Sequence, residues 1–168
     1  MGQLAGDPYR GFILLDVTSS VLALVSVWWF LRALVTPGMA VAGSLLLGAG
    51  PVFWGYGAMA GNYTAIIAVG AFLLGVAWRT WHRPRPWHPL TAAAVLALGT
   101  GYRQDIGTFW MPAFLLILWK HRWKSAIYAC LLFTVLNLTW LLAMLHDVGG
   151  WTRYRVKKAP SSPIALVI

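Results

Sequence analysis

Two charged residues, Arg103 and Asp105, lie in the otherwise apolar stretch GTGYRQDIGTFWMPAFLL at positions 99–116. An arginine keeps its charge at physiological pH, and its planar guanidinium matches the oxygens of a phosphate group. A carboxylate two residues away can orient the guanidinium, coordinate a cation or cap a helix that begins there. We therefore expect Arg103 to bind phosphate, with Asp105 in an orienting or capping role. The alternative is an arginine at the membrane interface, paired with Asp105 and without a ligand.

Further polar candidates occupy other parts of the chain. Asn62 and Tyr63 lie in a turn between apolar segments, where they can hydrogen-bond a polar ligand, although a tyrosine there is often an interface anchor. Asp16 lies inside the first apolar segment and is expected to bond Ser or Thr neighbours rather than to catalyse. Trp54 is expected to be an interface anchor, with a place in a sugar site as the alternative.

The composition predicts a membrane protein. Of the 168 residues, 60% are hydrophobic and 10% are charged, whereas soluble domains carry about 25% charged residues. The 13 Lys and Arg face only four acidic residues, and they cluster between apolar runs rather than in one patch. This pattern favours lipid phosphates over nucleic acid as partners. The single Cys130 excludes a disulfide within the chain and is expected to be buried, and no His or Cys spacing is typical of a metal site.

Apolar segments follow one another along the whole chain and predict an all-α, polytopic transmembrane bundle in one membrane domain over residues 1–168. Six segments are expected, at 12–35, 38–60, 62–81, 89–102, 106–119 and 125–145. The first is long enough to cross a bilayer, and Pro51 should kink the second. The fourth and fifth are short, and they predict a helical hairpin near 89–119 with GYRQD at its tip.

The basic runs predict the orientation of the bundle. HRPRPWH at 82–88 and KHRWK at 120–124 are expected on the cytoplasmic side, where short loops are rich in Lys and Arg. Tyr63 and the hairpin tip then lie on the opposite side. A tip that ends below the membrane surface must pack in protein or face a wet cavity.

Three stretches, taken in order, resemble one known family. GPVFWGYGAMAGNYTA, GTGYRQDIGTFWMP and DVGGWTRY are similar to the GT-C superfamily of membrane glycosyltransferases, in particular to relatives of the protein mannosyltransferases and the lipid A aminoarabinose transferase. The resemblance implies transfer of a sugar from a polyprenyl phosphate on the non-cytoplasmic side of a bacterial inner membrane. It also implies an outer-loop carboxylate that activates the acceptor, often with a divalent cation. Arg103 matches the family's basic position for the lipid phosphate.

The chain departs from this family at its acidic positions. The family's main catalytic carboxylate lies in an outer loop after a first helix, and no similar acidic motif surrounds Asp7. Some relatives carry Glu-x-Tyr-Thr where this chain has Gly-Asn-Tyr-Thr at 61–64. The catalytic residue is therefore unknown, and we expect either part of a longer transferase or a non-catalytic, lipid-binding membrane subunit. A small transporter is a third alternative, although it would predict internal repeats and polar residues distributed through the spans.

Overall fold

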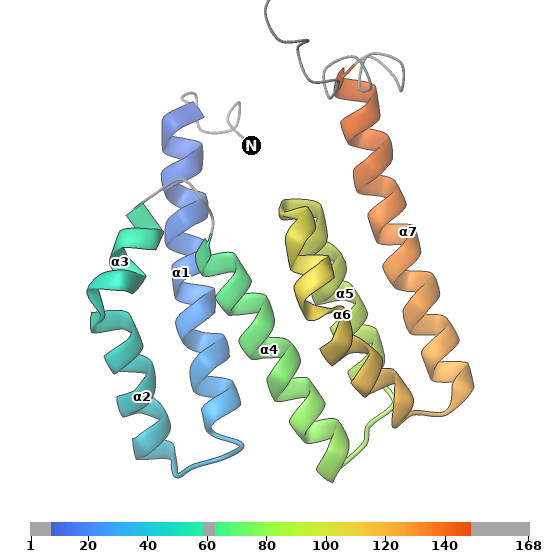
Figure 1. Cartoon of the computed structure of the whole chain (residues 1–168), viewed down its shortest axis with the longest axis horizontal. Coiled ribbons are helices and arrows are strands. Elements are labelled where there is room, and N and C mark those ends of the chain that lie inside the picture. The colour runs from blue at the N-terminus through green and yellow to red at the C-terminus, as the bar shows by residue number, and fades with distance from the viewer. Residues whose placement is uncertain (1–7, 59–62, 149–168) are drawn as a thin grey trace, which may run out of the picture.

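The computed structural model describes residues 8–58 and 63–148, and within these ranges the chain forms seven helices and no strand (Figure 1). This confirms the all-α fold class for the described residues. The helices are α1 (Pro8–Leu31), α2 (Pro37–Ala49), α3 (Pro51–Ala58), α4 (Tyr63–His82), α5 (His88–Tyr102), α6 (Gln104–Trp119) and α7 (Trp123–Val148).

Three of these helices are long and apolar enough to cross a membrane. The qualifying stretches are Ile13–Leu31 in α1, Tyr63–His82 in α4 and Trp123–His146 in α7. The other four helices have between 8 and 16 residues, fewer than the roughly 20 that a full span requires. The predicted count of six spans is therefore not confirmed.

The second predicted segment, 38–60, is two helices rather than one kinked helix. α2 ends before Gly50, which has extended backbone angles, and α3 begins at Pro51. Proline has no N–H to donate to residue 47, and its ring clashes with the carbonyl group of that residue. The chain therefore leaves the helix at Gly50 and starts a new one, instead of bending continuously.

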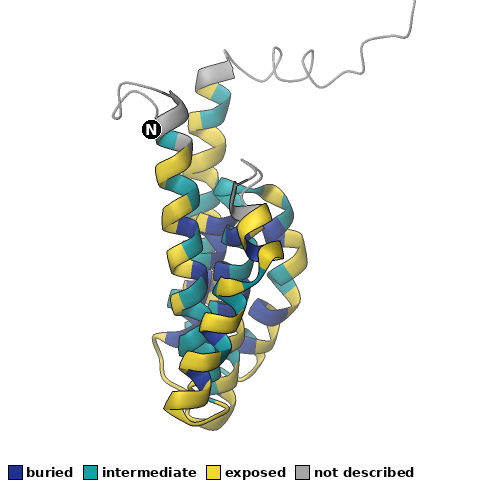
Figure 2. Ribbon diagram, turned by 90° about the vertical axis from the view of Figure 1, so that its left-hand side faces the viewer, coloured by how far each residue is buried: buried dark blue, intermediate teal, exposed yellow. Residues whose placement is uncertain are grey.

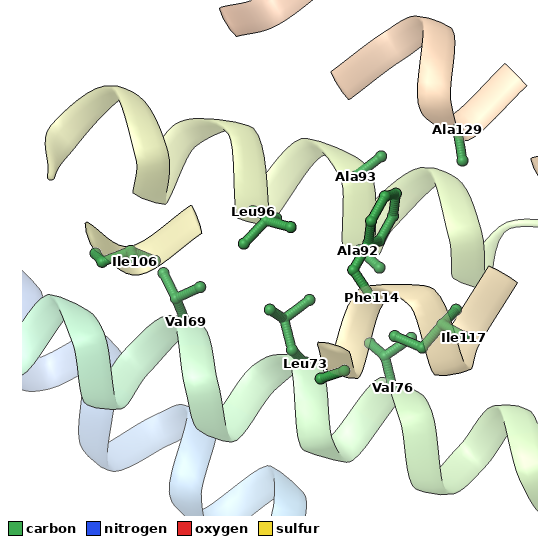
Figure 3. Close-up of a cluster of buried hydrophobic side chains, with 11 residues drawn as sticks. Val69, Leu73, Val76, Ala92, Ala93, Leu96, Ile106, Phe114, Ile117 and Ala129 are labelled. Carbon is green, nitrogen blue, oxygen red and sulfur yellow. The ribbon is translucent and has the colours of Figure 1, made fainter. Parts of the chain in front are cut away.

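The core of the bundle lies between α4, α5 and α6. Figure 3 shows side chains from these helices pointing toward one another, with Ala129 of α7 at the edge. Small residues allow this close packing, since Ala92, Ala93 and Ala97 are fully buried along α5. On either side of this core, α1 packs against α4 and α7 packs against α5. The buried members of the core cluster are Val69, Leu73, Val76, Ala92, Ala93, Leu96, Ile106, Ala113, Phe114, Ile117 and Ala129.

The outer faces of the long helices are apolar and exposed. Figure 2 shows exposed residues along the outside of the bundle and buried residues within it. Large apolar side chains such as Leu22, Leu131 and Leu142 are more than half exposed, and an exposed apolar surface of this kind is typical of a membrane interface. Cys130 is also exposed on α7, so the expectation that it is buried was wrong. Only one narrow face of α7 packs against the core, and Cys130 lies outside it.

The turns collect at the two ends of the bundle. Figure 1 places the α1–α2, α4–α5 and α6–α7 connections at one end, and the α5–α6 turn and the beginning of α4 toward the other. The basic runs at 82–88 and 120–124 therefore share one end. Arg103 and Tyr63 lie toward the opposite end, as the alternation of segments predicts.

Candidate functional site

The predicted hairpin is present, and Arg103 is its turn. α5 ends at Tyr102 and α6 begins at Gln104, so one extended residue reverses the chain, with φ −150° and ψ 116°. The Arg103 N–H donates to the Gly99 carbonyl at 2.8 Å, and the Ile106 N–H donates to the Arg103 carbonyl at 3.1 Å. These bonds satisfy the main chain of the turn and fix the direction in which the arginine side chain leaves it.

Asp105, in the first turn of α6, holds the Arg103 side chain. Nε of Arg103 lies 2.9 Å from Oδ1 and 2.8 Å from Oδ2 of Asp105. Both contacts involve the same donor, the Nε–H group, which is one of the five N–H donors of the guanidinium. The side chains are 30% and 35% exposed, so the pair is accessible. Asp105 is therefore paired with Arg103, a contact that both the phosphate-binding and the interfacial interpretation of the sequence allow.

Tyr63, the first residue of α4, supports the same guanidinium from the side. The Arg103 guanidinium carbon lies 4.5 Å from the centre of the Tyr63 ring, within the range of a cation–π contact. The structure therefore brings Tyr63, Arg103 and Asp105 together, from positions 40 residues apart. Asn62, the fourth predicted site residue, lies outside the described residues.

A cavity of about 540 Å³ lies between the hairpin tip and α7, and Tyr63, Arg103 and Asp105 are not among its lining residues. Gly101 and Gln104, which flank the Tyr102–Arg103 turn, line it from the hairpin side. The α7 side is mainly apolar and comprises Asn137, Trp140, Leu141, Ala143 and Met144. Sequence reasoning did not predict this cavity, because the face that α7 turns to the hairpin depends on tertiary packing.

Asp16 does not join the Arg103 cluster. It lines a separate pocket of about 370 Å³ between α1 and the α2–α3 region, together with Ser20 and Trp54. Trp54 is 67% exposed, which suits an interface anchor. The pocket therefore brings together Asp16, a carboxylate in the first predicted segment, and Trp54, an aromatic residue in the second.

A second polar cluster surrounds His88, at the opposite end of the bundle. His88 is 1% exposed, and its Nδ1 lies 2.9 Å from Oγ1 of Thr80. The Arg85 backbone N–H approaches the same nitrogen at 3.4 Å. Nδ1 is therefore the acceptor, and the proton of the neutral ring belongs on Nε2. Burial lowers the pKa of His88, and the neighbouring His121, Arg85 and Arg79 lower it further.

This environment predicts an acid-sensitive fold. Because the pKa of His88 is lower in the folded than in the unfolded protein, the unfolded protein binds a proton there more readily. The contribution of neutral His88 to stability is therefore complete above the ordinary histidine pKa of about 6.5, and is lost as the pH falls below that value. The thermal unfolding midpoint in detergent should drop between pH 7.5 and pH 5.5. His88→Gln should flatten this dependence, whereas His82→Gln, at an exposed histidine nearby, should keep it. An unchanged pH dependence in His88→Gln would rule out His88 as the cause.

The described residues do not fit the divalent cation that the family resemblance implies. No group of three His, Cys, Asp or Glu side chains in residues 8–58 and 63–148 comes together in a way that could hold a metal ion. Asp105, the carboxylate at the hairpin tip, is engaged with Arg103. No chemical step is therefore assigned to a metal here.

The chain matches no protein-family model, no curated protein sequence and no solved structure. The resemblance to the GT-C superfamily therefore stays a prediction.

Proposed function

We propose that this chain is an integral membrane protein of a bacterial inner membrane that binds a polyprenyl-phosphate-linked sugar at Arg103. In this proposal it takes part in transfer of the sugar to an acceptor on the non-cytoplasmic side, as part of a GT-C-type glycosyltransferase. The observation that supports it is an arginine held by Asp105 and Tyr63 at a hairpin turn, whose neighbours Gly101 and Gln104 line a largely apolar cavity. A lipid phosphate has the matching chemistry, with an anionic head and an apolar chain.

The depth of the hairpin tip supports a lipid ligand. α5 has 15 residues and is about 22 Å long, whereas the hydrocarbon core of a bilayer is about 30 Å thick. In Figure 1 the hairpin tip stops short of the upper ends of α1 and α7. If the lower ends of α1 and α7 lie at one membrane surface, the α5–α6 turn with Arg103 lies several ångströms below the opposite membrane surface. An arginine at such a depth is costly unless it is paired, and it is typical of a substrate pathway.

In this proposal Arg103 acts on the leaving group. When the sugar leaves the carrier, the bond between its anomeric carbon and the phosphate oxygen breaks, and negative charge develops on that phosphate. A guanidinium that is already oriented stabilises this charge without reorganising during the reaction. Asp105 is then a positioning residue, and Tyr63 lines the polar side of the site.

A second candidate function is lipid binding without transfer. Both carboxylate oxygens of Asp105 lie against Arg103 Nε, so this carboxylate is engaged and poorly placed to take a proton from an acceptor. The chain would then hold a polyprenyl phosphate for another subunit. Turnover of a polyprenyl-phosphate-linked sugar, measured with and without partner proteins, separates the two candidates.

Equilibrium binding tests the part that both candidates share. The full chain is placed in nanodiscs of phosphatidylcholine and titrated with labelled undecaprenyl phosphate. Undecaprenol, which has the same apolar chain without the phosphate, is the matched ligand control. We expect saturable binding of the phosphate and at least tenfold weaker binding of the alcohol. Equal binding of the two ligands, or binding of neither, would contradict the proposal.

A further inference from the structure

A strongly basic pocket lies at the end of the bundle opposite Arg103. It has a volume of about 560 Å³ and lies where α1 and α4 end and α5 begins. None of its lining residues is acidic. The described acidic side chains lie elsewhere. Asp105 is at the hairpin tip, and Asp16 precedes Arg32 of the pocket by about 24 Å along α1. The basic residues that line the pocket are Arg32, Arg79, His82, Arg83, Arg85 and His88.

Arg79 is fixed in place inside this pocket. Its Nη1 donates to the Gly75 carbonyl at 3.1 Å, and its Nη2 donates to the Trp29 carbonyl at 2.8 Å. The guanidinium carbon lies 3.5 Å from the centre of the Trp29 ring. Gly75 makes room for this arrangement, because a Cβ there would lie 2.5 Å from the same ring. A ligand that meets Arg79 therefore loses little free energy to the ordering of this side chain.

The pocket lies at the boundary of the candidate spans. Arg32 directly follows the span Ile13–Leu31, and the span in α4 ends at His82. Trp78 and Trp81 are 41% and 57% exposed beside it, and exposed tryptophans are enriched at the level of lipid headgroups. A phosphate of a headgroup is therefore the anion that reaches this position in a membrane.

We propose that this pocket binds the phosphate group of an anionic phospholipid headgroup. Arginines match phosphate oxygens in geometry and charge, and basic pockets between transmembrane helices bind anionic headgroups. Four arginines without an acidic neighbour in the pocket repel one another, and a bound anion relieves this repulsion. Free phosphate has the same chemistry, and the test below distinguishes the two sources. The inference depends on the proposed membrane location but not on sugar transfer or on Arg103.

The test uses the full chain in an uncharged detergent and follows its thermal unfolding midpoint. The chain is titrated with phosphatidylglycerol, phosphatidylcholine or sodium phosphate, each at matched ionic strength. Arg83→Gln/Arg85→Gln removes two charges from the pocket and leaves the Arg79 contacts intact. Lys120→Gln/Lys124→Gln removes two charges from the same end outside the pocket and is the matched control.

We expect phosphatidylglycerol, but not phosphatidylcholine, to raise the midpoint of the wild type. Arg83→Gln/Arg85→Gln should need at least tenfold more phosphatidylglycerol, whereas the lysine control should change within twofold. If only sodium phosphate raised the midpoint, and Arg83→Gln/Arg85→Gln lost this effect, the pocket would bind free phosphate and not a lipid headgroup. Equal weakening in the two double variants, equal effects of the two lipids, or no response to any ligand would overturn the inference.

Discussion

Arg103→Ala is expected to weaken binding of undecaprenyl phosphate by about ten- to a hundredfold in phosphatidylcholine nanodiscs. A hydrogen bond to a charged group contributes about 1.5–3 kcal/mol, and about 1.4 kcal/mol corresponds to a tenfold change in affinity. Arg103→Lys keeps the charge but loses the planar fork, so it should fall between the wild type and the alanine variant. Binding of undecaprenol, which lacks the phosphate, should not change.

Two further variants separate this role from a general effect of charge. Asp105→Asn keeps the shape of the side chain but removes the carboxylate that orients Arg103, and it should weaken binding severalfold. Arg122→Ala removes an exposed arginine at the opposite end and should leave the affinity unchanged. If Arg122→Ala weakened binding as much as Arg103→Ala, the effect would be one of net charge and not of a site.

Gly70→Ala is expected to destabilise the bundle, although the substitution adds only one methyl group. Gly70 faces the Trp110 ring of α6, and a Cβ at this position would lie 2.0 Å from Cζ2 and 2.4 Å from Cε2 of that ring. The ring must move or the helices must separate, and overpacking of this kind costs about 1–3 kcal/mol. The better helix propensity of alanine, about 1 kcal/mol, offsets part of this loss.

Gly55→Ala is the matched control for this steric argument. Gly55 is also helical, in α3, and a Cβ there would meet no atom within 4 Å. Its substitution should leave the free energy of unfolding unchanged or raise it slightly. Denaturant-induced unfolding in mixed micelles measures both variants. Equal stabilities of Gly70→Ala and Gly55→Ala would contradict the close approach of α4 and α6.

The hairpin was predictable because its signals are local. Two short apolar segments flank a polar tip, and a 15-residue helix cannot cross a bilayer by itself, so the chain had to turn near Arg103. The ion pair with Asp105 follows from a separation of two residues in the same turn. The break at Pro51 was predicted as a kink, because the sequence did not show that Gly50 would adopt extended angles and end α2.

The other contacts depend on tertiary packing that no local pattern shows. Tyr63 reaches Arg103 because α4 packs beside the hairpin, and no local sequence pattern indicates how close the two residues lie. Arg79 lies three residues before the basic run at 82–88. Its fold back onto the Trp29 carbonyl joins residues 50 positions apart. Gly75, one helical turn before Arg79, leaves the space that this contact needs.

Photo-crosslinking tests most directly whether a polyprenyl phosphate binds at Arg103. Undecaprenyl phosphate with a photoreactive group next to its phosphate is bound to the full chain in nanodiscs and irradiated, and the labelled peptides are mapped. The proposal predicts label at the hairpin turn around residues 100–105 and at the beginning of α4, and its loss with excess unlabelled lipid. Label confined to the basic pocket at residues 79–88, or label that excess lipid does not displace, would contradict it.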